Sequence, residues 1–152
     1  GKKHIVFEIG SYSVVSRLLD GEFLNYKSAI PGESTTEVRV NTRQFIDSIE
    51  RISLIITDKI KSPLRCTFGD NAIRLSSTTA LGSASDEVSA AIDGSSVDIG
   101  FNNRFLIEAL RVCDTDEVRI LLNGPVSPIL IMPPDGDSFL FLILPVRLKT
   151  EA

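Results

Sequence analysis

The acidic, histidine and cysteine side chains are the first candidates for chemistry. His4 is the only histidine, which removes Ser-His and Cys-His nucleophilic pairs and any histidine-rich metal site. Asp135 and Asp137 resemble a carboxylate pair, but their Asp-Gly-Asp spacing is typical of a solvated turn. The same interpretation holds for Asp114 and Asp116. With neither GxGxxG nor GxxxxGK[ST] present, the sequence offers no convincing catalytic or metal site, and we expect no cofactor.

Composition limits the class of protein further. The chain has 152 residues, 43% of them hydrophobic, which is enough for one good core. Its net charge of −4 argues against gripping nucleic acid with the whole surface, but it allows one basic face. Cys66 and Cys113 are far apart and lack a CxxC pattern, so we expect reduced thiols in a cytoplasmic protein. No apolar run reaches the roughly 18 residues of a membrane span, and no membrane partner is expected.

The elements that would position any site are organised as repeats. Residues 6–31 and 121–145 both read strand, Gly, strand, Asp-Gly turn, strand, Pro, and they lie about 115 residues apart, the size of a small domain. We therefore expect the chain to begin at the end of one module and to run through a complete second one. Turn residues at 31–34 mark the linker. We assign residues 1–32 to the first module with its linker and residues 33–152 to the second.

The second module contains its own, weaker repeat. Residues 40–46 resemble residues 101–106, and in each copy an Asn follows a short strand, where it can cap an amphipathic helix. Three strands follow each helix, which predicts β-α-β-β-β twice over. The fold class is α+β, with two helices packed on one side of antiparallel sheets. The expected strands are 37–40, 64–68, 72–79 and 87–92, then 97–101, 117–122, 129–132 and 139–146.

The C-terminal segment is very apolar. Pro145 cannot donate to a strand ladder, so regular pairing should end there. Val146 and Leu148, on either side of Arg147, would then form a small exposed hydrophobic patch, which is a common sign of peptide docking.

Three stretches, taken in order and spacing, resemble the beta subunit of bacterial DNA polymerase III, the replicative sliding clamp. They are LLDGEFLNY at 18–26 ahead of Ile30-Pro31, IGFN at 99–102, and the closing LPVRL at 144–148. The resemblance spans nearly the whole chain. It implies the DNA-clamp fold and a homodimeric ring of three-domain subunits, of which this chain is the end of the middle domain plus the third domain. It also implies a non-catalytic processivity factor that encircles double-stranded DNA without reading sequence and docks polymerase and clamp-loader peptides.

The resemblance also implies functional residues. The DNA-facing residues would be Arg43, Arg51, Asn103, Arg104 and Arg111. The peptide-binding pocket would use Leu24, Ser28, Ala29, Ile60, Asn102, Phe105, Val126, Pro128, Leu142, Ile143, Leu144, Pro145, Val146, Arg147 and Leu148. The dimer interface would use Leu54 and Ile55, with the edge strand around 83–89. The family often has Pro at Leu24, Arg at Ser28, Tyr at Phe105, Ser at Pro128 and Met at Val146, so partner preference should differ here.

Two other functions fit the sequence. One is a peptide-binding module that makes no DNA contact. The other is the non-catalytic end of an enzyme whose active site lies upstream. The repeats favour the clamp, because a repeated scaffold suits a ring, and an intact length of about 370 residues would support it.

Overall fold

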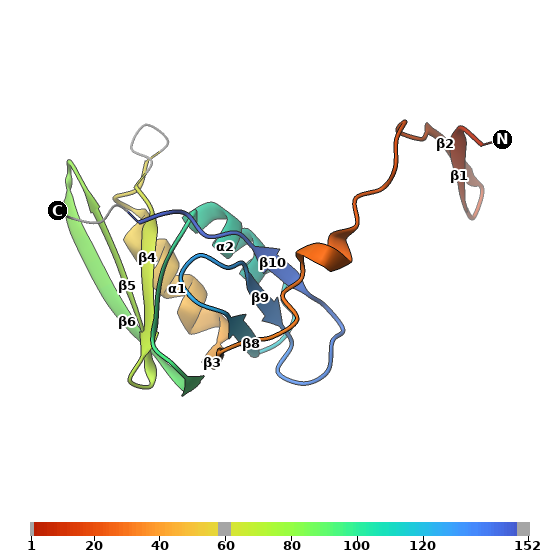
Figure 1. Ribbon diagram of the computed structural model, residues 1–152. Helices are drawn as coiled ribbons and strands as arrows, with labels where there is room; N and C mark the ends of the chain where they lie inside the picture. Colours follow the sequence, from red (N-terminus) through yellow and green to blue (C-terminus); the bar gives the residue numbers. More distant parts are fainter. Residues whose placement is uncertain (1, 58–61, 149–152) are drawn as a thin grey trace.

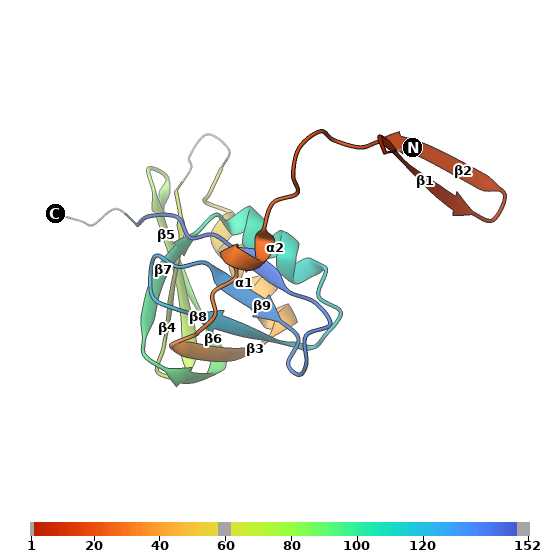
Figure 2. The same ribbon diagram turned by 45° about the vertical axis from the view of Figure 1, so that its right-hand side comes forward.

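The computed structural model describes residues 2–57 and 62–148, which form an arm and a body (Figure 1). The arm contains the antiparallel hairpin β1 (His4–Ile9) and β2 (Tyr12–Arg17), followed by the short 3-10 helix η1 (Tyr26–Ala29). All side chains from 2 to 29 are exposed. Figures 1 and 2 show the hairpin standing away from the body.

The body is built around one eight-stranded antiparallel sheet. Its strand order is β10-β9-β8-β3-β6-β5-β4-β7. The strands are β3 (Thr36–Asn41), β4 (Leu64–Gly69), β5 (Ala72–Thr79), β6 (Gly82–Gly94), β7 (Val97–Phe101), β8 (Glu117–Leu122), β9 (Ile129–Met132) and β10 (Phe141–Ile143).

Two helices pack against each other on one face of this sheet. They are α1 (Thr42–Ser53) and α2 (Asn103–Arg111). Each begins where the sequence predicts, because an Asn side chain accepts a hydrogen bond from a free N–H of the first turn: Asn41 from Gln44 N at 3.0 Å, and Asn102 from Arg104 N at 3.0 Å. Their apolar stripes, including Phe45 of α1, lie in the core. The α+β class with both helices on one side is confirmed.

The internal repeat is present, but its two copies exchange their first strands. The first copy is β3-α1-β4-β5-β6 and the second is β7-α2-β8-β9-β10. In the sheet, however, β3 pairs with β8 of the second copy, and β7 pairs with β4 of the first. The long strand β6 joins the halves, because 82–89 pair with β5 while 90–94 pair with β3.

Two strand predictions were wrong in extent, and a third predicted strand does not form. The strand expected at 87–92 covers 82–94, because β6 has two successive partners. The strand expected at 139–146 is only 141–143, since Pro145 interrupts it. No strand forms at 22–30, where η1 occurs instead. The long-range repeat nevertheless appears in the backbone, since its matched glycines Gly10 and Gly124 have φ of 60° and 81°.

Candidate functional site

The ionisable side chains of the described residues do not assemble a reactive centre. Across 2–57 and 62–148, no group of three His, Cys, Asp or Glu side chains could hold a metal ion. Burial, with a smaller contribution from Asp98, raises the pKa of the Cys66 thiol. Burial and the Asp114 charge raise the pKa of Cys113 to about 11, so both thiols stay protonated and are poor nucleophiles. No helix among these residues is long and apolar enough to cross a membrane.

The residues assigned to the DNA-facing surface lie on the two helices, and carboxylates balance most of their charge. Arg43 Nε lies 3.0 Å from Asp47 Oδ1 within α1. Arg111 Nη2 on α2 donates to Glu50 Oε1 on α1 at 2.8 Å, which links the helices. Asn103 belongs to the same helix contact, because its Nδ2 donates to Ser53 Oγ at 2.8 Å.

The remaining two arginines have different surroundings. Arg51 is exposed, but its guanidinium is bound to Asp86 of β6, with Nη2 2.6 Å from Oδ2. Arg104 is exposed in the first turn of α2 and lines a cleft beside the C-terminal segment. The five residues therefore share the helix layer without forming a single cluster of unbalanced cations.

The C-terminal segment leaves the sheet at Pro145 and returns to it at one point. Val146 N donates to Gly100 O of β7 at 2.7 Å, which forms an isolated antiparallel bridge. A Cβ on Gly100 would lie 2.6 Å from Val146 O and 2.8 Å from Leu148 Cδ2, so the absence of a side chain allows the close approach.

A cleft of about 330 Å³ lies beside this bridge. The sequence predicted two of its lining residues as pocket residues, Asn102 and Val146. It missed the other lining residues, because they come together only through folding: Ile56, Thr57, Ser62, Pro63 and Phe101, with Asn103 and Arg104 from α2. The Ser-Pro turn signal at 62–63 was the one local hint. Ile60 lies outside the described residues.

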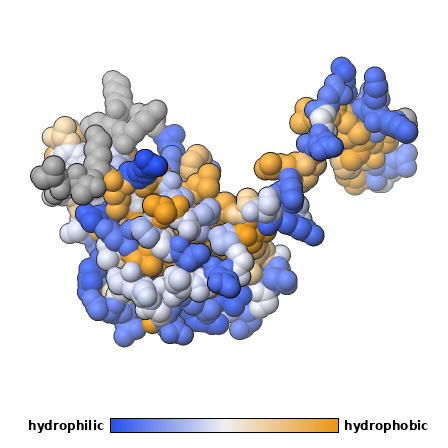
Figure 3. Space-filling model, in the orientation of Figure 1, coloured by the Kyte–Doolittle hydropathy of each residue, from blue (hydrophilic) through white to orange (hydrophobic). Residues whose placement is uncertain are grey.

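The other predicted pocket residues are spread over the sheet and arm. Leu142 pairs with Leu130, and Leu130 with Leu121, so the three side chains form a row on the face away from the helices. Pro128 lines a smaller cleft of about 70 Å³ with linker residues 31–34. Ile143 differs, because its side chain packs in the core. Exposed positions are Leu24, Ser28, Ala29, Phe105, Val126, Leu144 and Arg147, and Leu148 is half-buried. Figure 3 shows apolar patches on the body and on the arm.

The candidate subunit-contact surface combines a helix end and a strand edge. Leu54, the residue that caps α1, is 81% exposed, Ile55 is half-buried, and Ile56 packs against the core. Residues 82–89 of β6 pair with β5 on one side. On the other side, β3 pairs only with 90–94, which leaves this half of β6 as an open edge among the described residues.

Comparisons with known proteins agree on one family. Residues 27–147 match the model of the DNA polymerase III beta subunit, C-terminal domain. The chain is 30% identical over 145 residues to the beta sliding clamp of Staphylococcus aureus, covering 94% of this chain and 38% of that protein.

Solved structures agree in fold. The DNA polymerase sliding clamp of Bacillus subtilis superposes with a TM-score of 0.91 at 31% identity, over 97% of this chain and 40% of that one. A putative DNA polymerase III beta subunit from Eubacterium rectale gives 0.89 at 36% identity, over 95% and 39%. The chain thus spans about two fifths of the length of the relatives it matches. With the family model covering most of its length, the chain belongs to the family of the DNA polymerase III beta subunit, C-terminal domain.

Proposed function

We propose that this chain is the C-terminal part of a replicative sliding clamp, which encircles DNA and tethers the polymerase without catalysing a reaction itself. The observation that carries the proposal is the match in both sequence and fold to beta sliding clamps over almost the whole chain. The paired charges on the helices suit weak, mobile contact with phosphates, since a clamp must slide.

The arm fits the end of a preceding domain. Register places Ile5, Phe7 and Ile9 on one hairpin face together with Val14 and Tyr12, and these side chains are exposed. An amphipathic strand pair of this kind needs a cover for its apolar face. We therefore assign residues 1–32 to the end of the domain upstream, and residues 33–152 to the third domain of the subunit.

The peptide-docking surface comprises the 142–148 segment, the row of Leu121, Leu130 and Leu142, and the cleft at the start of α2. Its apolar walls suit a short peptide bearing Leu and Phe side chains, with Arg147 and Asn102 available for polar contacts. The related clamp from Bartonella birtlesii was solved with bound griselimycin, so griselimycin provides a defined probe. Deleting 146–148 from the intact protein should abolish binding of both the Leu- and Phe-bearing peptide and griselimycin, as measured by calorimetry. Unchanged binding would contradict the assignment.

Retention on DNA tests the ring function. The intact protein, loaded by its clamp loader onto nicked circular DNA, should stay bound and should be released when the circle is linearised. Retention should be independent of base sequence. A double variant, Arg43→Ala with Arg104→Ala, should shorten retention on the circle and make it less sensitive to salt. Arg74→Ala, on the opposite face of the sheet, is the matched control and should behave as the wild type. Equal retention on circular and linear DNA would overturn the proposal.

Subunit contact has a separate test. Because Leu54 is exposed, Leu54→Ala with Ile55→Ala should leave the domain folded while removing apolar contact from the proposed interface. Burying two such side chains contributes about 3–6 kcal/mol, so light scattering on the intact double variant should detect folded monomers. A dimer of wild-type affinity would place the interface elsewhere.

A further inference from the structure

Two polar residues occupy positions that the core pattern reserves for apolar side chains. Ser48 on α1 has an exposed fraction of 0%. Asp86 on β6 pairs with Leu75, a core residue of β5, so its side chain faces the helices as Leu75 does. Asp86 is half-buried, with its side chain 27% exposed. A buried hydroxyl such as that of Ser48 is costly unless it is paired, and here it pairs with Asp86.

Asp86 joins the helix to the strand through a single carboxylate. Ser48 Oγ donates to Asp86 Oδ2 at 2.8 Å, and Arg51 Nε donates to the same oxygen at 2.8 Å. The other oxygen, Oδ1, accepts from the backbone N–H of Glu87 at 2.9 Å. Ser48, Arg51 and Asp86 are called here the Asp86 cluster.

The carboxylate is charged in this setting. Burial alone would raise the pKa of Asp86, but the hydrogen bonds from Ser48, Arg51 and the Glu87 backbone, with the Arg51 charge, lower it overall. Charge-assisted hydrogen bonds are about twice as strong as neutral ones. They hold this strand to α1 from the helix side.

The cluster lies at the open edge of β6. Residues 82–89 pair with β5 and have no strand on their other side among the described residues, whereas 90–94 pair with β3, and Ala90 N also donates to Asn71 O in the β4–β5 turn at 3.0 Å. An open edge presents unpaired N–H and C=O groups that can pair with another strand, and the register of that pairing is poorly defined when the edge has few restraints. Asp86 supplies the restraint that a second neighbouring strand would otherwise supply.

We propose that Asp86 is a positioning residue that fixes the open edge of β6 to α1, and so presents that edge in one geometry to a strand of a second subunit. The proposal rests on the proposed ring function and deepens it. It also assigns Arg51 a different role from Arg43: its guanidinium braces the interface strand, and its contribution to retention on DNA is indirect.

Residue-resolved hydrogen exchange tests whether Asp86 holds β6 to α1 within this chain. Asp86→Asn removes the charge and keeps the size, and it should speed exchange of the β5-paired amides in 82–89 by about tenfold. Exchange in 90–94 and in β8 should be unchanged. Asp93→Asn, on the exposed face of the same strand, is the matched control. Ser48→Ala removes one contact only and should give a smaller effect of the same kind, which covers the case in which Asp86→Asn does not fold.

The affinity between subunits tests the second part of the proposal, that Asp86 presents the edge of β6 to a second subunit. In the intact protein, Asp86→Asn should raise the dimer dissociation constant at least about tenfold with little change in melting temperature, and Asp86→Glu should restore affinity in part. The proposal is overturned if exchange in 82–89 matches that of Asp93→Asn, if exchange rises throughout the domain, or if dimer affinity is unchanged. If the wild-type intact protein is not a dimer, the ring function fails instead, while the exchange result still decides whether Asp86 ties β6 to α1.

Discussion

Gly100 shows how one residue places the C-terminal segment. After Pro145 breaks the ladder, the Val146 N–Gly100 O bond returns the C-terminal segment to the sheet. Backbone and side-chain atoms of Val146 and Leu148 fill the space where a Cβ would be.

Gly100→Ala should therefore displace the segment. We expect a loss of about 1–3 kcal/mol in the free energy of unfolding, typical of overpacking, and faster exchange of the Val146 amide. Gly32→Ala is the control, because nothing lies within 4 Å of the corresponding Cβ. Wild-type protection of the Val146 amide in Gly100→Ala would show that the segment is held by other contacts.

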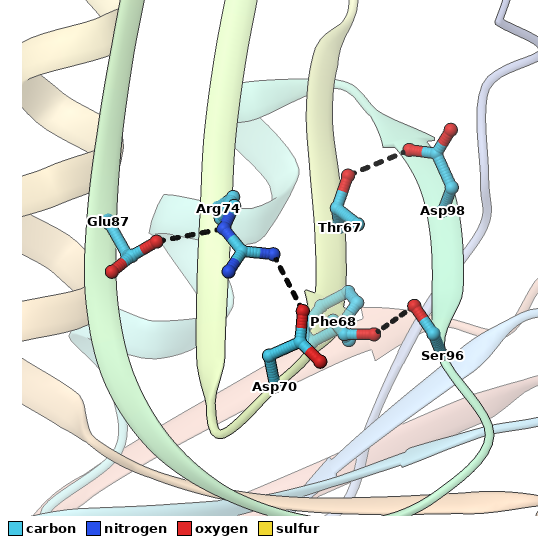
Figure 4. A network of polar contacts seen from close by, with 7 residues as sticks. All are labelled: Thr67, Phe68, Asp70, Arg74, Glu87, Ser96 and Asp98. Carbon is cyan, nitrogen blue, oxygen red and sulfur yellow. Dashed lines mark hydrogen bonds and ion pairs between the residues drawn. The ribbon is translucent and has the colours of Figure 1, made fainter.

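Among the elements, the outer face of β7-β4-β5-β6 carries a row of polar side chains across the strands (Figure 4). Arg74 Nε on β5 donates to Glu87 of β6 at 2.9 Å, and Thr67 Oγ1 on β4 donates to Asp98 of β7 at 3.1 Å. Exposed pairs contribute little individually. Their main effect is to keep this face polar where the opposite face is core.

Because of this row, the free energy of unfolding should depend on pH in the acidic range. Hydrogen bonds from Arg65, then from Thr67, lower the pKa of Asp98 below its usual 3.8, with burial opposing them. A carboxyl with a lowered folded-state pKa contributes stability above its unfolded pKa, and this is lost as the pH falls through the folded value. Asp98→Asn should thus lower the free energy of unfolding at pH 7 and show a smaller further fall at about pH 3 than the wild type. Urea titrations at both pH values measure this, with exposed Asp135→Asn as control.

The helix caps provide an element-scale test of the sequence pattern. Asn41→Ala leaves the Gln44 N–H of α1 without its partner, so it should lower the free energy of unfolding by about 1 kcal/mol, within a usual range of about 0.5–2. Asn41→Asp keeps an acceptor and should retain stability. The midpoint of urea unfolding distinguishes them, and an unchanged midpoint for Asn41→Ala would mean that the β3–α1 junction is set by packing alone.

At the scale of the whole molecule, the arm and the body are energetically separate. Residues 2–29 bury no side chain, whereas Thr35 N donates to Leu122 O at 2.8 Å and begins the body. The apolar hairpin face contributes exposed area and no core contact, so it adds a tendency to associate without stability.

Removing residues 1–29 should therefore leave the melting temperature within about 2 °C of that of the full chain, and it should improve solubility. A chain beginning at Thr36 is the contrasting variant, because it loses the Thr35 bond and the linker beside Leu130, and it should melt lower. A large fall in melting temperature for the first truncation would show that the arm packs on the body in solution.

Elements whose signals are local could be predicted from the amino-acid sequence. Asn41 and Asn102 mark helix starts because capping needs only neighbouring residues, and the strands at 97–101, 117–122 and 129–132 follow from their own alternation. The sequence also carried the family resemblance. Tertiary structure decided what depends on partners distant in the chain: the exchange of β3 and β7 between repeats, the full length of β6, and the absence of a strand at 22–30. It likewise decided that Arg51 is bound to Asp86 and that Ser62 and Pro63 meet Val146 in one cleft, because pairing and cleft walls are set by register and packing between segments far apart in sequence.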